Sequence, residues 1–119
     1  MRVMLADDQP RVRFALRLLL SRQPGLEIVG EASDAADLFG QIEAVRPDLL
    51  LLDWELPGLV AAGGVSALYK THPMLRVVAL SGHPEALRAA LESGAQAFVS
   101  KADPPELLLA ELDRQKHLA

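Results

Sequence analysis

The chain has 119 residues, half of them hydrophobic, so it is the size of one domain and can bury a single core. Its 12 basic and 16 acidic side chains give a net charge of -4, which predicts no direct nucleic-acid binding by this chain. The sequence has no cysteine for disulfides or thiolate metal sites, no signal-peptide core and no apolar run of membrane length, so we expect a cytoplasmic protein without membrane contact.

The first half of the chain alternates short apolar runs with amphipathic stretches. This pattern predicts strands over 2–6, 26–32 and 49–53, with helices over 10–22 and 34–46 between them. Pro10 suits the first turn of a helix, where its missing N–H costs nothing. Ser33 or Asp34 is expected to cap the second helix. The order strand, helix, strand, helix, strand is typical of an α/β domain.

The second half continues this alternation. It predicts a short helix over 65–72, a strand over 76–80, a helix over 84–93, a strand over 97–100 and a last helix that carries 107–112. Gly94 is expected to stop the fourth helix. Asp103 is expected to cap the last helix, with Glu106 completing a capping box. Five strand-helix units with right-handed crossovers predict a parallel sheet with helices on both faces.

Three acidic residues follow two of the predicted strands. Four consecutive leucines run directly into Asp53, and the first strand runs into Asp7 and Asp8. Ligands of open α/β sheets bind beyond the carboxyl ends of the strands, which share one edge. Clustered carboxylates need a cation to remain ionised, and oxygen ligands suit Mg²⁺. The sequence therefore predicts a magnesium site at this edge.

Two further polar residues occupy equivalent places. Ser81 follows the fourth strand and Lys101 follows the fifth. A hydroxyl and an ammonium facing a metal-bound carboxylate suit an incoming phosphoryl group. A carboxylate can attack phosphorus as a nucleophile to give an aspartyl phosphate. These residues therefore predict phosphoryl chemistry at Asp53.

The ordered set of motifs resembles the receiver domain of bacterial two-component response regulators. It consists of Asp7-Asp8, the apolar strand ending in Asp53 with Pro57-Gly58 after it, Ser81 and Lys101. The sequences of residues 1–10, 27–32, 46–48 and 94–101 are most similar to the NarL/LuxR-like subfamily. The resemblance covers the whole chain and implies one receiver domain over 1–119, with an output domain absent from this chain. It also implies a flavodoxin-like doubly wound fold with strand order 2-1-3-4-5.

The resemblance also implies roles for individual residues. Asp53 would be the phosphoacceptor, with a sensor histidine kinase as the donor. Asp8 would bind Mg²⁺ directly, Asp7 through water, and Glu55 through its backbone carbonyl. Ser81 and Lys101 would hold the phosphoryl group, and Ser81 and Phe98 would form the conformational switch.

By this resemblance the chain is a phosphoacceptor signalling domain that switches conformation to control an output, which we expect to be transcription. It is not a classical enzyme, although it would catalyse its own phosphorylation and dephosphorylation. A homodimer would use the first helix, where Phe14 and Leu18 flank the inner stripe, or the last, which carries Leu109. The segment from Ser81 to Gly94 is about two residues shorter than in most relatives, a shortening expected to fall at the start of the fourth helix.

Two other functions are compatible with parts of the sequence. A receiver-like interaction module would keep the acids and bind its partner without phosphorylation, and a phosphotransfer assay separates it from a phosphorylated receiver. A nucleotide- or flavin-binding enzyme is disfavoured, because the first strand-helix turn carries Asp7-Asp8-Gln9-Pro10 and no glycine-rich phosphate loop. A bound chromophore in the purified protein would favour this enzyme.

Overall fold

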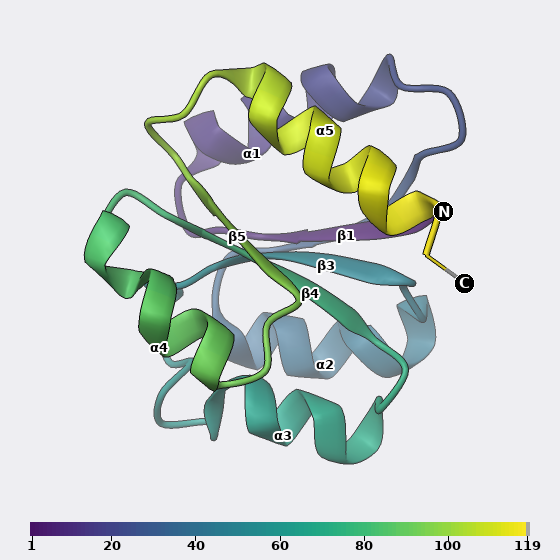
Figure 1. Cartoon of the computed structure of the whole chain (residues 1–119). Coiled ribbons are helices and arrows are strands. Elements are labelled where there is room, and N and C mark those ends of the chain that lie inside the picture. Colours follow the sequence, from purple (N-terminus) through teal and green to yellow (C-terminus); the bar gives the residue numbers. More distant parts are fainter. Residues whose placement is uncertain (119) are drawn as a thin grey trace.

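The chain forms one parallel sheet between two layers of helices (Figure 1). In the computed structural model, which describes residues 1–118, the strands follow the order β2-β1-β3-β4-β5, so the predicted flavodoxin-like topology is confirmed. The elements are β1 (Arg2–Ala6), α1 (Pro10–Ser21), β2 (Glu27–Ala32), α2 (Ala35–Val45), β3 (Leu49–Asp53), α3 (Gly64–Thr71), β4 (Arg76–Ser81), the 3-10 turn η1 (Pro84–Ala86), α4 (Leu87–Glu92), β5 (Ala97–Ser100) and α5 (Pro105–Lys116). Within 1–118, none of the helices combines the length and the apolar character needed to span a bilayer.

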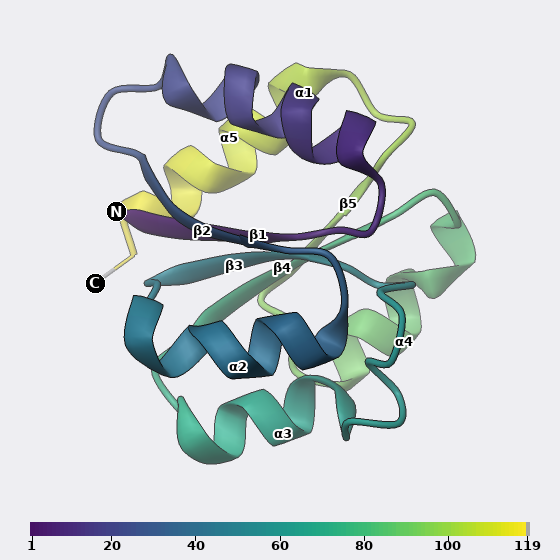
Figure 2. The same ribbon diagram turned by 180° about the vertical axis from the view of Figure 1, so that it is seen from behind.

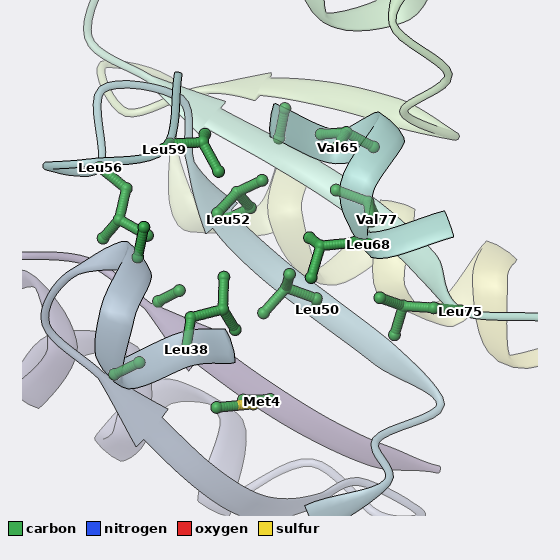
Figure 3. Packing of buried hydrophobic residues seen from close by; sticks show 14 of the residues in the cluster. Met4, Leu38, Leu50, Leu52, Leu56, Leu59, Val65, Leu68, Leu75 and Val77 are labelled. Carbon is green, nitrogen blue, oxygen red and sulfur yellow. The ribbon is translucent and has the colours of Figure 1, made fainter. Parts of the chain in front are cut away.

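The two faces of the sheet carry separate apolar cores. Helices α1 and α5 cover one face, and α2, α3 and α4 lie on the other, as two opposite views show (Figures 1 and 2). The Met4 cluster, on the side of α2 and α3, includes Met4, Ala6, Leu38, Ile42, Leu50, Leu52, Val65, Leu68, Val77 and Ala79 (Figure 3). The Val3 cluster, on the side of α1 and α5, includes Val3, Leu5, Leu20, Leu49, Leu51, Val78, Leu80, Val99, Leu108 and Leu112.

The leucine run of β3 shows why the sheet needs helices on both sides. Leu50 and Leu52 belong to the Met4 cluster, whereas Leu49 and Leu51 belong to the Val3 cluster. Successive side chains of a strand point to opposite faces, so four leucines in a row fill both cores. All five residues of β3 are buried. This strand therefore holds Asp53 at the end of the most deeply buried part of the chain.

Several helix ends follow the sequence signals. Pro10 occupies the first turn of α1. Asp34 is the N-cap of α2, and its carboxylate accepts a hydrogen bond of 2.7 Å from the Asp37 N–H. Gly94 follows α4 with φ of +105°, a left-handed conformation that glycine adopts without strain. These three predictions are confirmed.

Two helix starts differ from the prediction. Pro104 is the N-cap of α5, and this helix has no side-chain cap; the carboxylate of Asp103 instead accepts a hydrogen bond of 3.1 Å from Ser100 N–H. The residue before a proline is driven to an extended conformation, so Pro105 shifts the cap by one position. The predicted fourth helix begins as the 3-10 turn η1, and its α-helical part, α4, has only six residues.

Candidate functional site

The predicted site residues meet at one edge of the sheet. The backbone N–H of Asp7 donates to Ala32 O over 3.0 Å, and the N–H of Lys101 donates to Ser81 O over 2.8 Å. Asp53 is paired with Leu80 in the β3–β4 register. These contacts fix the backbone of each residue at its strand end, so the local ladder positions the side chains before any ligand binds.

The three acids lie close enough to share one cation. One carboxylate oxygen from each of Asp7, Asp8 and Asp53 lies within 4.8 Å of the other two. Asp7 and Asp53 are buried, whereas Asp8 is exposed. Within 1–118, the Glu55 carbonyl accepts no hydrogen bond and remains available as a further oxygen ligand. An all-oxygen donor set that is open to solvent on one side fits Mg²⁺, which keeps several of its waters.

Lys101 supplies the positive charge between the two buried acids. Its Nζ lies 2.7 Å from Asp7 Oδ2 and 3.5 Å from Asp53 Oδ1. Burial by itself would lower the pKa of Lys101, but the short ion pair with Asp7 and the charge of Asp53 outweigh it and raise this pKa. Lys101 therefore remains an ammonium at neutral pH and can attract an anion.

Asp53 lies in surroundings that disfavour its charge. Burial raises the pKa of its carboxyl group. The hydrogen bond of 3.0 Å from Glu55 N–H to Asp53 Oδ1 opposes this rise, as does the charge of Lys101, whereas the charge of Asp7 adds to it. The pKa of Asp53 is raised overall, so a cation beside this carboxylate would favour its charged form.

The Ser81 side chain is fully buried and has partners on both sides. Its hydroxyl lies 2.9 Å from each Glu55 carboxylate oxygen and donates to this carboxylate, while Ser81 Oγ accepts a hydrogen bond of 2.9 Å from His83 N–H. Phe98, the other predicted switch residue, is half-buried on β5 and packs against the Met4 cluster. Ser81 therefore points at Glu55 in this state, a contact that the sequence did not predict.

Arg13 is a second contributor that the sequence analysis missed. Its Nη1 donates a hydrogen bond of 2.5 Å to Asp7 O, and its Nε lies 3.5 Å from Glu31 Oε1. The side chain thus connects α1 and β2 to the end of β1. Four arginines lie between residues 11 and 22, and no sequence signal distinguishes Arg13 from the others. Its contact with the Asp7 carbonyl stabilises the loop that carries both adjacent acids.

The comparisons with known proteins agree with this geometry. The family model described as response regulator receiver domain matches residues 3–113. The nitrate/nitrite response regulator protein NarL of Escherichia coli K12 is 34% identical over 112 residues, which cover 92% of this chain and 52% of NarL. The signal receiver domain of the putative response regulator NarL from Mycobacterium tuberculosis has 35% identity and a TM-score of 0.82, covering 98% of this chain and 97% of that structure.

A second similar structure is RcsB of Salmonella enterica serovar Typhimurium, described as bound to promoter rprA in the presence of phosphomimetic BeF3⁻. It has 28% identity and a TM-score of 0.86, covering 98% of this chain and 60% of that protein. Together with the acidic edge and the strand order, these matches define a signalling domain. The chain belongs to the response regulator receiver domain family of two-component systems, in its NarL/LuxR-like branch. It spans about half the length of the curated relatives it matches.

Proposed function

We propose that this receiver domain accepts a phosphoryl group on Asp53 from a phosphohistidine of a sensor histidine kinase and thereby switches its conformation. The observation that supports this most directly is the cluster of Asp7, Asp8 and Asp53, whose carboxylate oxygens lie within 4.8 Å of one another beside the Lys101 ammonium. A nucleophilic carboxylate, oxygen ligands for a metal and a fixed positive charge are the groups that phosphoryl transfer needs.

Each residue has a distinct task in this proposal. Asp53 attacks phosphorus, and the bond between phosphorus and the donor nitrogen breaks. Asp8 would bind Mg²⁺ directly, Asp7 through water and Glu55 through its carbonyl, and the bound ion would supply charge neutralisation. Lys101 binds a phosphoryl oxygen as a point charge. Ser81 donates a hydrogen bond to another phosphoryl oxygen, and Phe98 follows the movement of Ser81.

We also propose that the switch controls transcription through an output domain outside these 119 residues. Two observations support this: the chain spans about half the length of its curated relatives, and these include a protein named as a transcriptional activator. The structural relative RcsB is described as bound to a promoter. In this proposal the receiver domain itself does not contact DNA, in keeping with its net charge of -4.

Intact-mass measurement after incubation with a small phosphodonor and Mg²⁺ tests the assignment of Asp53. The wild-type chain should gain one phosphoryl group, and Asp53→Asn should gain none over the same incubation time. Asp113→Asn is the matched control, because Asp113 is an exposed acid on α5 outside the site. Asp8→Asn should still be modified at high Mg²⁺ but require more than about tenfold more of the ion, because losing even a partner that only supports a metal ligand costs about 10- to 100-fold in affinity.

The same measurement distinguishes a receiver-like module that acts without phosphorylation. Such a module would bind its partner equally well with and without the phosphodonor and would show no gain in mass. If Asp53→Asn were phosphorylated as fast as the wild-type chain, another residue would be the acceptor and the proposal would be wrong.

A further inference from the structure

The buried Ser81 hydroxyl has one acceptor in this structure. Its side chain has no exposed surface, and within residues 1–118 the Glu55 carboxylate is the only group to which it donates. The oxygen of the same hydroxyl already accepts from His83 N–H. A hydroxyl has a single hydrogen, so Ser81 cannot donate to a phosphoryl oxygen while it donates to Glu55.

Glu55 is placed to act on both the serine and the phosphoacceptor. Its backbone N–H donates to Asp53 Oδ1 over 3.0 Å, while its carboxylate accepts from Ser81 on the neighbouring strand. Glu55 itself is exposed. The Glu55 side chain can therefore rotate into solvent, where water replaces its hydrogen bond at little cost in free energy. Ser81, in contrast, must find another acceptor or lose a buried hydrogen bond.

From these contacts we propose that the Glu55 carboxylate is a competing acceptor that holds Ser81 away from the phosphoryl group. Phosphorylation of Asp53 then transfers the Ser81 hydrogen bond from Glu55 to a phosphoryl oxygen. This inference rests on the proposed function, because it requires an anion on Asp53. Glu55 acts as a positioning residue. Its side chain weakens the binding of the phosphoryl group, because the Ser81–Glu55 hydrogen bond must break before Ser81 can donate to a phosphoryl oxygen.

The charges favour the exchange in one direction. A phosphoryl group brings about -1.5 to -2 charges to the site, and the Glu55 carboxylate carries a like charge beside it. Repulsion moves Glu55 towards solvent at the moment when a new acceptor becomes available to Ser81. Before phosphorylation, the contact between Ser81 and Glu55 lowers the population of the active arrangement.

The test measures the dissociation constant of beryllofluoride in the presence of Mg²⁺ for the unmodified chain and for Glu55→Ala. The one tryptophan, Trp54, follows Asp53 directly, so its fluorescence reports binding. Removing the competing acceptor should tighten binding about tenfold, the factor that one charge-assisted hydrogen bond supplies. Glu55→Gln, which keeps a neutral acceptor, should give an intermediate value.

A double-mutant cycle separates the competing contact from simple charge repulsion. In the Ser81→Ala background, Glu55→Ala should have little effect on the dissociation constant, because the hydroxyl for which Glu55 competes is gone. Glu85→Ala removes an exposed charge from η1, has no contact with Ser81 and should leave the dissociation constant unchanged. An equal effect of Glu55→Ala with and without Ser81 would assign the gain to charge alone and overturn this inference.

The same binding measurement distinguishes failure of this inference from failure of the proposed function. If the unmodified chain binds beryllofluoride but Glu55→Ala binds it no more tightly, the competition between acceptors is wrong and the proposed function stands. If neither chain binds beryllofluoride, and intact mass shows no phosphorylation, the proposed function is wrong and this inference falls with it.

Discussion

The ammonium nitrogen of Lys101 lies 2.7 Å from Asp7 Oδ2 and is farther, 3.5 Å, from Asp53 Oδ1. The lysine is thus paired mainly with Asp7, the acid that follows β1, rather than with the proposed phosphoacceptor. A cation at the acids would compete with this ammonium for Asp7. In the proposed function, the lysine would therefore oppose metal binding before phosphorylation and support the phosphoryl group afterwards.

Lys101→Gln should separate these two effects. We expect Mg²⁺ to bind about tenfold more tightly, because a positive charge a few ångströms from the ion is removed. Beryllofluoride should bind more weakly, because its anionic charge loses a partner. Titrations followed by Trp54 fluorescence measure both constants, with the exposed Lys70→Gln as the control. Weaker Mg²⁺ binding by Lys101→Gln would contradict this account.

Tyr69 should make the stability depend on alkaline pH. Its hydroxyl lies 2.7 Å from Gly94 O and 2.9 Å from Gln96 Oε1, and burial raises its pKa above the ordinary 10.0. Above pH 10.0 the tyrosine of the unfolded chain ionises first, so the contribution of Tyr69 to stability is constant below this pH and is lost as pH rises through the folded pKa.

Tyr69→Phe should cost about 1 kcal/mol near neutral pH, the usual value of a hydrogen bond, but should lack this alkaline loss. Urea unfolding of both chains, at neutral pH and above pH 10.0, measures the difference. Tyr69 is the only tyrosine, so tyrosinate absorbance reports its titration directly. A constant difference between the two chains at all pH values would rule out the effect.

Leu50→Ala should destabilise the domain by about 2–5 kcal/mol, because Leu50 is fully buried in the Met4 cluster and the truncation leaves a cavity. The matched control is Leu107→Ala on α5, where the leucine is 52% exposed. This control should change the free energy of unfolding by about 0.5 kcal/mol or less. Equal losses in the two variants, measured by urea unfolding, would show that burial does not set the cost.

A homodimer, if the receiver forms one through α1, should depend on Phe14 and Leu18. These side chains are 55% and 46% exposed and lie one helical turn apart. Sedimentation at high concentration, with and without beryllofluoride, measures the association. Phe14→Glu should abolish it, whereas Phe39→Leu, a change in the partly buried apolar set of the other face, should not. A monomer under all conditions would exclude this interface.

Phosphorylation should reach α4 less completely than it reaches the acids. The segment after Ser81 is fixed by the hydrogen bond from His83 N–H to Ser81 Oγ and by the 3-10 turn that begins at Pro84, whose φ is locked. A stiff segment between Ser81 and α4 makes the inactive and active conformations of α4 more alike. A ligand shifts an equilibrium only by binding the two conformations with different affinity, so phosphorylation should move α4 less.

Backbone amide NMR shifts on adding beryllofluoride and Mg²⁺ measure this propagation. We expect large shifts around Asp7, Asp8 and Asp53 and smaller ones over residues 82–101. The change of hydrogen-bond acceptor at Ser81 should therefore affect only its immediate surroundings. Shifts as extensive over 82–101 as around the acids would show that the loop does not restrict the switch.

The alternation of strands and helices predicted a parallel sheet and the place of the site, whereas the strand order was implied by the resemblance to receiver domains. The four leucines before Asp53 predict a strand covered on both faces, and helices alternating with such strands indicate a parallel sheet. The ends of parallel strands share an edge, so Asp7, Asp8, Asp53, Ser81 and Lys101 could be brought together without any side-chain detail. The structure confirms that these strand ends meet.

Two of the unpredicted features depend on side-chain direction, and a third depends on the backbone at a proline pair. The contact of Glu55 with Ser81 joins residues 26 positions apart and depends on one rotamer in an exposed turn. The contact of Arg13 with the Asp7 carbonyl depends on which of several arginines lies over the end of β1. The cap at Asp103 was predicted wrongly because two successive prolines compete to start α5, and the second determines the first helical position.

The division of the apolar core into two clusters by the sheet has a consequence for how this domain can diversify. Leu49 and Leu50 are adjacent in sequence but have no cluster in common. Substitutions that share no partners usually have additive effects on stability, so changes on the two faces should accumulate independently. During evolution, the layer of α1 and α5 can therefore change to fit a new binding partner while the layer of α2 and α3 changes independently. Both layers keep the acidic edge of the sheet in common.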